Sequence, residues 1–301
     1  MAPALQTALQ NRLNELLESE DLNGVSCYLE SAEHGYWYGA AGIENIAQNR
    51  PMDTTYSFWA ASVNKIFTSA LIFMLYEDSL LDIEDKIVDY VPGHSNINPN
   101  ATIEQALNHS SGIAEILRHP SAAQQWYNHN ANKVWDPNEV LSNYLQAQDF
   151  APGSAWSYSN TNYILLGMII EKVSGKSYAE FLEEKIILPL SLSNTWFPPF
   201  MESEQAISKG YSDFNQDGEW DDANFLHTPS FASMVFAAGA LVSTPKDLTK
   251  MAQALYNGNL FSNPETLEHY LQFLPVRISQ HALGYGYGCN SFDYLGDTYY
   301  G

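Results

Sequence analysis

The chain has 301 residues, of which 45% are apolar and 16% charged, and its 35 acidic against 13 basic side chains give a formal net charge of -22. A chain of this length can remove roughly 75% of its unfolded surface from water, which excludes a disordered protein. The acidic excess repels phosphate backbones, and the basic side chains are too few to form a stripe, so we expect no nucleic-acid partner.

The first predicted elements are a helix, a hairpin and a second helix. Leucines recur at helical spacing from Leu5 to Leu17, and Asn23-Gly24 follows as a stop. Residues 25–30 and 36–43 are rich in aromatic and branched side chains around a Glu-His-Gly turn, which predicts a β-hairpin. Residues 62–77 have almost no polar face, so we expect a helix that is buried on all sides.

The middle of the chain, residues 82–192, predicts a helical lobe. Asp136-Pro137 is typical of a helix start, and Asn160 precedes a periodic apolar run that Gly175 ends. After this lobe, residues 213–224 predict a polar hairpin tip and residues 240–242 a short strand. A further helix is expected from Thr244-Pro245 to Asn257-Gly258, and strand character returns at residues 284–292.

These elements predict a mixed α/β (α+β) fold. We expect one antiparallel sheet built from both chain ends, flanked by helices, with the helical lobe inserted between its two parts. The boundaries place a sheet lobe at about residues 1–61 and 205–301, and a helical lobe at about 62–204, within a single discontinuous domain. The longest apolar stretches are shorter than the roughly 18 residues of a membrane-spanning helix, so no span is expected.

The two cysteines, Cys27 and Cys289, stand at opposite ends of the chain and predict neither a disulfide scaffold nor a thiolate zinc site. We expect both to be ordinary buried thiols. A single disulfide between them is possible only if the strands that carry them are neighbours. The opening Met1-Ala2-Pro3-Ala4 has neither the charged nor the apolar region of a signal peptide.

The first candidate for chemistry is Ser62-Val63-Asn64-Lys65, at the start of the buried helix. A spacing of three places the hydroxyl and the amine on one helical face. Burial lowers the pKa of a lysine toward the range in which its neutral amine can take the serine proton. The N–H groups at the helix start would favour an oxyanion beside Ser62. A helix-terminal serine with a lysine reaching into solvent would explain the same motif.

Two further motifs bear on this hypothesis. Ser243-Thr244-Pro245-Lys246 has the same spacing, but its pattern predicts a helix cap with a solvated lysine. Tyr158-Ser159-Asn160 is the only Tyr-x-Asn in the chain. Its phenol could shuttle protons and its carboxamide could bind a substrate amide. A turn tyrosine and an asparagine N-cap would explain the same residues.

Together these motifs resemble the serine β-lactamase and penicillin-binding protein family, in the branch of class C β-lactamases, soluble D-alanyl-D-alanine carboxypeptidases and related esterases. The likeness extends over residues 58–65, 80–92, 102–112, which end in His109-Ser110-Ser111-Gly112, 150–175 and 237–247. The resemblance implies a β-lactamase/transpeptidase-like fold, with Ser62 as the acylated nucleophile and Lys65 as its base. It also implies Tyr158 as proton shuttle and Asn160 as a ligand of the substrate amide and of Lys65, although the acylation base is disputed in this superfamily.

The third motif of that family, a Lys or His followed by x-Gly on the strand that closes the site, is absent. Residues 295–301 resemble the lead-in to that strand. We therefore expect that the C-terminal strand and helix are missing, that the natural product extends further, and that a protein ending at Gly301 is poorly active.

An acidic segment offers a candidate calcium site. Residues 213–218, followed by more acidic side chains, match the opening of a calcium loop, but the twelfth position is Asn224 where a bidentate Glu is expected. An acidic hairpin tip with an Asp-Gly turn explains the same residues. The predicted chemistry requires no cofactor, and no other metal site is expected. The candidate calcium ligands are Asp213, Asn215, Asp217 and Asp221.

The sequence therefore predicts a serine hydrolase that forms a covalent acyl-enzyme on D-Ala-D-Ala-type peptides or small esters. A class C-like β-lactamase is the alternative within the family, but no residue identifies the group that would drive fast deacylation. A non-catalytic penicillin- or peptide-binding module is the alternative of another class. The resemblance suggests the periplasm or the exterior, with a small-molecule or peptide substrate as partner.

Overall fold

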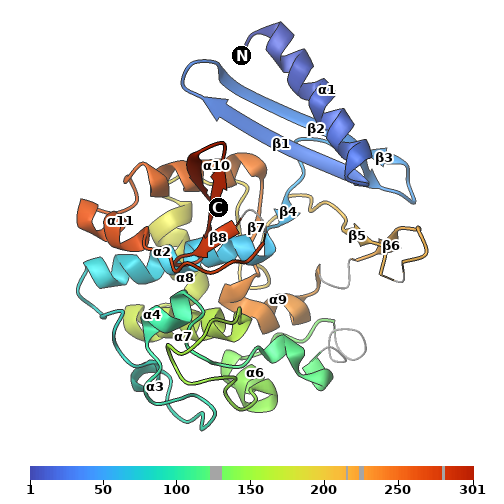
Figure 1. Ribbon diagram of the computed structural model, residues 1–301. Coiled ribbons are helices and arrows are strands. Elements are labelled where there is room, and N and C mark those ends of the chain that lie inside the picture. The colour runs from blue at the N-terminus through green and yellow to red at the C-terminus, as the bar shows by residue number, and fades with distance from the viewer. Residues whose placement is uncertain (123–130, 215, 224–226, 280–281) are drawn as a thin grey trace.

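A helix-covered hairpin forms the N-terminal part of the computed structural model, which describes residues 1–122, 131–214, 216–223, 227–279 and 282–301. Helix α1 (Pro3–Ser19) lies along the hairpin of β1 (Gly24–Ser31) and β2 (Gly35–Asn45), as Figure 1 shows. The two strands pair antiparallel, and β3 (Arg50–Pro51) adds to β2. The predicted first helix and hairpin are confirmed.

The chain then enters the interior through a short strand. Strand β4 (Phe58–Trp59) pairs with β7 (Val242–Ser243) and leads through the 3₁₀ turn η1 (Ala61–Val63) into helix α2 (Asn64–Glu77). Phe67, Leu71 and Phe73 on α2 are at most 1% exposed. Since apolar side chains occupy nearly all sides of α2, burial within the core stabilises it. The predicted fully buried helix is confirmed.

The middle of the chain forms helices that pack around α2. One of them, α7 (Asn160–Ser174), contacts α2 directly. Helix α7 is itself almost wholly buried, and it ends at Gly175 in the left-handed conformation (φ 69°). Helix α6 begins after the Asp136 cap, as predicted. This part contains α3 (Ile87–Tyr90), α4 (Ile103–Leu107), the 3₁₀ turn η2 (Ile116–Arg118), α6 (Pro137–Tyr144), α7 (Asn160–Ser174), α8 (Tyr178–Leu182) and a π-helical turn (Glu183–Ile187).

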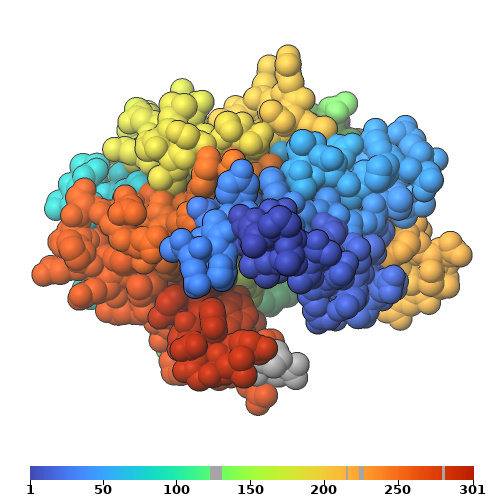
Figure 2. All heavy atoms as spheres, turned by 90° about the horizontal axis from the view of Figure 1, so that it is seen from above, coloured from blue at the N-terminus to red at the C-terminus, as the bar shows by residue number. Residues whose placement is uncertain are grey.

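In its described residues, the C-terminal part adds three helices and two further sheets. Its elements are β5 (Tyr211–Ser212), β6 (Asp221–Asp222), α9 (Pro229–Val235), the 3₁₀ turn η5 (Phe236–Ala238), α10 (Pro245–Tyr256), α11 (Pro264–Tyr270), β8 (Ala282–Tyr285), β9 (Asn290–Tyr294) and β10 (Asp297–Tyr300). Strands β5 and β6 form the predicted polar hairpin. Figure 2 shows α1 and the hairpin in the middle of one face, with the C-terminal strands projecting at the lower edge of the view.

One sequence prediction about strands is confirmed, and another differs from the structure. The strand character expected at residues 284–292 is found in β8 and β9, which are joined by a turn at Gly286–Gly288. The single sheet expected from both chain ends is, in the described ranges, two separate three-stranded antiparallel sheets, β1-β2-β3 and β10-β9-β8. Alternating side chains indicate which segments are strands but not their partners, because strand pairing is non-local. The mixed α/β class is confirmed.

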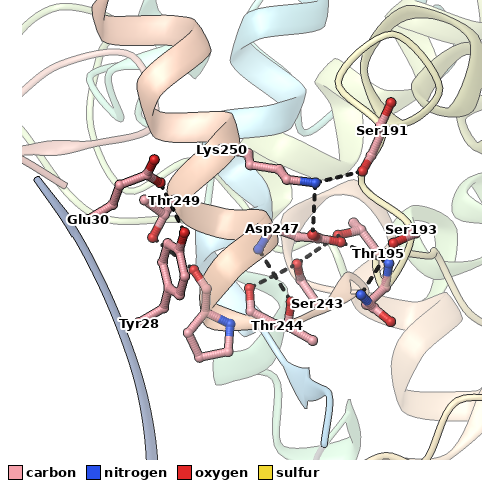
Figure 3. Close-up of polar contacts among 12 residues, drawn as sticks. Tyr28, Glu30, Ser191, Ser193, Thr195, Ser243, Thr244, Asp247, Thr249 and Lys250 are labelled. Atoms are coloured by element: carbon pink, nitrogen blue, oxygen red, sulfur yellow. Dashed lines mark hydrogen bonds and ion pairs between the residues drawn. The ribbon is translucent and has the colours of Figure 1, made fainter. Parts of the chain in front are cut away.

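A buried carboxylate fixes the start of α10 (Figure 3). Thr244 caps the helix by accepting the N–H of Asp247, whose side chain is 1% exposed. The Asp247 carboxylate accepts the backbone N–H of Asn194 at 2.8 Å and lies 3.8 Å from the ammonium of Lys250. Lys246 is exposed. The second Ser-x-x-Lys sequence is therefore a helix cap with a solvated lysine, as predicted.

The thiols of Cys27 and Cys289 are both free, so the alternative of a bridge between them is wrong. Burial raises the pKa of Cys289 to about 12, and this thiol is therefore protonated and unreactive. Among the described residues, we find no helix with the length and apolar character needed to cross a membrane.

Candidate active site

The predicted nucleophile and base lie at the mouth of α2. Ser62 stands in η1 and is exposed, whereas Lys65 stands in the first turn of α2 and is 1% exposed. Ala61, with φ 47°, turns the chain from β4 into η1. The Nζ atom of Lys65 lies 3.3 Å from Oγ of Ser62. The predicted spacing of three thus brings a reachable hydroxyl against a buried amine.

Two further oxygens orient the Lys65 amine. Its Nζ donates to Oδ1 of Asn160 and to the carbonyl oxygen of Ala238, both at 2.7 Å. A neutral amine has two N–H groups and one lone pair, so these two acceptors leave the lone pair facing Ser62. Burial lowers the pKa of Lys65 to about 7, against the opposing charge of Glu115. Near neutral pH a large share of the amine can therefore accept a proton.

A strained turn supplies the carbonyl that faces Lys65. Phe236, which follows α9, has φ 42°, a conformation that costs free energy for a bulky side chain. The turn aims two successive carbonyls at α2: that of Ala237 accepts from the Thr68 hydroxyl at 2.7 Å, and that of Ala238 accepts from Lys65. These two hydrogen bonds fix the turn on the helix that carries the base.

Tyr158, in the loop that precedes α7, also contacts the Ser62 hydroxyl. Its phenol donates to Oγ of Ser62 at 2.8 Å. Its ring packs on His109 with 4.4 Å between ring centroids, and His109 in turn contacts the Tyr285 hydroxyl at 2.9 Å. Burial raises the pKa of Tyr158 to about 12, so the phenol keeps its proton at neutral pH. Tyr158 is therefore placed to donate a proton to Ser62, and Lys65 is placed to accept one.

Asn160 is the first residue of α7, and a distant carboxylate holds its backbone. Ser159 at the N-cap makes no side-chain cap, and the N–H of Asn160 instead donates to Oε2 of Glu115 at 2.5 Å. Sequence reasoning missed Glu115 as part of this site and assigned His109 no position beneath Tyr158. A carboxylate inside the apolar run of residues 113–117 was the signal for a buried, partnered acid.

The structure thus brings together all four residues that were predicted for this site. Tyr158 donates to Ser62, and the Ser62 proton can point to the lone pair of Lys65, whose N–H groups Asn160 and Ala238 occupy. Such an arrangement can activate a hydroxyl for attack on a carbonyl and return a proton to a leaving group.

The candidate calcium ligands lie elsewhere, on the β5–β6 hairpin. Asp213 accepts the backbone N–H groups of Asp217 and Gly218, and Asp221 accepts that of Phe214. Asn215 lies outside the described residues. Within the ranges that are described, no group of three or more His, Cys, Asp or Glu side chains is placed to hold a metal ion. Calcium binding stays a prediction.

Comparison with known proteins decides the family. The family model Beta-lactamase matches residues 9–301. This chain belongs to the β-lactamase family. It is 30% identical over 290 residues to "Penicillin-binding protein 4*" of Bacillus subtilis, covering 93% of this chain and 62% of that protein. It is 26% identical over 255 residues to "Teichoic acid D-alanine hydrolase" of Staphylococcus aureus, covering 83% and 58%.

Solved structures agree with this assignment. A D-stereospecific amidohydrolase from Streptomyces sp. superposes with a TM-score of 0.81 at 26% identity, covering 98% of this chain and 86% of that one. D-amino acid amidase from Ochrobactrum anthropi superposes with a TM-score of 0.84 at 24% identity, covering 99% and 84%, and shares the fold. The chain spans about three fifths of the length of the curated relatives it matches.

Proposed function

We propose that this protein is a serine acyl hydrolase that forms a covalent acyl-enzyme on Ser62. The observation that carries the proposal is the unbroken path of contacts from the Tyr158 phenol through the Ser62 hydroxyl to the Lys65 amine. A hydroxyl alone is a weak nucleophile, and an adjacent buried base is the usual means of activating it.

Acylation follows from this geometry. As Oγ of Ser62 forms a bond to the substrate carbonyl carbon, the hydroxyl proton passes to the lone pair of Lys65. The tetrahedral intermediate then collapses, the bond from carbon to the leaving oxygen or nitrogen breaks, and that atom takes the Tyr158 proton. The Lys65 ammonium returns a proton to Tyr158, so Ser62 carries the acyl group and the amine is neutral again.

In deacylation, water is the nucleophile and Lys65 again accepts the proton. The water oxygen bonds to the acyl carbon while its proton passes to the neutral Lys65 amine. The ester bond to Oγ breaks, and Oγ takes the proton from the Lys65 ammonium, which restores the starting hydroxyl and the neutral amine and releases the acid. In this scheme Lys65 serves both half-reactions, and we identify no second base for the water among the described residues. We therefore propose slower deacylation than in an efficient β-lactamase.

For the substrate, we propose D-alanine-terminated peptides or small esters. The names of two relatives, a teichoic acid D-alanine hydrolase and a D-stereospecific amidohydrolase, support acyl groups of D-configuration. Asn160 is the group we assign to the substrate amide, because its Oδ1 is occupied by Lys65 and its amide N–H groups remain to serve as donors. A class C-like β-lactamase is the second candidate within the family.

A labelling experiment tests the proposal. Exposure to a fluorophosphonate should add one phosphonyl group to Ser62 with loss of fluoride, detected by intact mass and peptide mapping. Ser62→Ala should give no adduct, and Lys65→Ala should slow labelling by at least about 100-fold because the base is lost. Lys246→Ala, in the second Ser-x-x-Lys sequence, should label like the parent protein.

The outcomes separate the alternatives. Cleavage of p-nitrophenyl esters and D-alanyl peptides faster than nitrocefin supports the proposed substrates, whereas the reverse order supports a β-lactamase. Absence of an adduct in folded parent protein would overturn the hydrolase proposal and leave a non-catalytic binding module.

A further inference from the structure

A buried carboxylate, which belongs to none of the family motifs described above, contacts the backbone of the candidate active site. Glu115 is 7% exposed and lies just before the 3₁₀ turn η2. Its Oε1 accepts the N–H of Leu117 at 2.8 Å, and its Oε2 accepts the N–H of Asn160 at 2.5 Å. One side chain therefore joins the η2 turn to the first residue of α7.

This carboxylate caps α7 from another part of the chain. The first N–H groups of a helix have no partner within the helix, and Ser159 at the N-cap position supplies none from its side chain. A negative charge at this end also interacts favourably with the helix dipole. Thr161 adds to the junction, because its hydroxyl donates to the Ala114 carbonyl at 2.6 Å and accepts the N–H of Ile116 at 3.0 Å.

The junction of η2 with α7 is connected to Lys65 through Asn160. Asn160 is held by Glu115 through its backbone, and its side-chain Oδ1 accepts from Lys65 at 2.7 Å. We propose that Glu115 is a positioning residue that sets both the place of Asn160 and the charge state of Lys65. This inference rests on the proposed function of Ser62 and Lys65.

Charge gives Glu115 an effect that a neutral cap would not have. A carboxylate near the amine favours the ammonium form and so raises the pKa of Lys65, opposing the larger lowering by burial. The other titratable groups that face Lys65 are neutral near pH 7: Tyr158 and Tyr163, whose rings lie 4.9 and 5.3 Å from Nζ, have raised pKa values. His109 is fully buried with a pKa well below its usual value. Glu115 is thus the charged group that balances Lys65.

Labelling of Ser62 needs the neutral amine, so its rate rises with pH through the pKa of Lys65. Removing the negative charge destabilises the ammonium and lowers that pKa. The acid limb of the labelling rate should therefore move to lower pH, by roughly one unit.

The test compares two matched variants, one at the junction of η2 with α7 and one further along α7. Glu115→Gln removes the charge and keeps an acceptor oxygen. Glu171→Gln makes the same change at a half-buried carboxylate of α7 that accepts the Tyr178 N–H at 2.9 Å. Glu171 lies eleven positions beyond Asn160, roughly 16 Å along the helix. Rates of fluorophosphonate labelling are measured from pH 5 to 9 for both variants and the parent.

We expect the midpoint to fall by about one pH unit in Glu115→Gln and to stay in place in Glu171→Gln. Equal midpoints in all three proteins would overturn the role of Glu115 while leaving the hydrolase proposal intact; a parent that is never labelled would overturn the hydrolase proposal itself. If Glu115→Gln does not fold, Glu115→Asp replaces it. The shorter acid keeps the charge but withdraws from Asn160, so labelling should slow at least tenfold, and an unchanged rate would refute the inference.

Discussion

At the scale of single residues, burial separates two lysines that share one sequence pattern. Lys65 is 1% exposed and its pKa falls to about 7, whereas Lys246 is exposed on the first turn of α10. An ammonium in an apolar interior loses its hydration, so its pKa falls. The lysine of the motif can thus serve as a base, as proposed for Lys65, only where the helix that carries it is buried on all sides.

Tyr158 allows a test of proton delivery to the leaving group. Tyr158→Phe removes the hydroxyl and keeps the ring that packs on His109. We expect kcat/KM for alkyl esters and amides to fall by about 100- to 10,000-fold, because their leaving groups depart only with a proton. A p-nitrophenyl ester, whose phenolate leaves unprotonated, should lose far less.

The control for this variant is Tyr90→Phe, which removes a hydroxyl that donates to Asp85 and has no contact with Ser62 or Lys65 among the described hydrogen bonds. It should leave both kinds of substrate unaffected. An equal loss for p-nitrophenyl and alkyl esters in Tyr158→Phe would contradict the proton-donor role and indicate that the phenol only orients Ser62.

Only some of the contacts in this site could be predicted from the sequence, and the reason is physical. Ser62 and Lys65 could be predicted as neighbours because three residues along a helix fix their geometry. Their meeting with Tyr158 could be inferred only through a family resemblance. The position of Glu115 beneath Asn160 could not be inferred, because a contact between residues 45 positions apart depends on how η2 packs against α7.

At the scale of elements, the turn between β8 and β9 presses directly on the helix of the base. Ser69 on α2 donates to the Tyr287 carbonyl at 2.7 Å. Gly288 follows with φ 88°, and a Cβ atom there would lie 2.6 Å from the Lys65 carbonyl oxygen. The sequence indicates strand character at residues 284–292, but it does not show that the chain must turn here to meet α2.

Two glycines with nearly the same backbone conformation test this contact. Gly296 has φ 91° with open space around it, so Gly296→Ala should cost only the left-handed strain of about 1 kcal/mol. Gly288→Ala adds an overlap with backbone and should cost about 1–3 kcal/mol more. Urea denaturation measures both free energies of unfolding. Equal losses would show that the turn moves freely away from α2.

At the scale of the whole molecule, acidic side chains outnumber basic ones by 35 to 13, and Ser62 is exposed to solvent. The net charge of -22 produces a negative potential that extends about 10 Å from the surface at 0.1 M ionic strength. A substrate that carries a carboxylate, such as a D-alanine-terminated peptide, approaches against this field, whereas a neutral ester does not.

Salt should therefore act differently on the two proposed substrate classes. Raising NaCl from 0.02 to 0.5 M shortens the Debye length to roughly 4 Å, so kcat/KM for the anionic peptide should rise several-fold. The value for a neutral ester on the same protein should stay nearly constant, which controls for effects of salt on folding. If kcat/KM for the peptide instead falls with salt, a local positive region guides the carboxylate to Ser62, and the net charge of the molecule does not govern the approach of substrate.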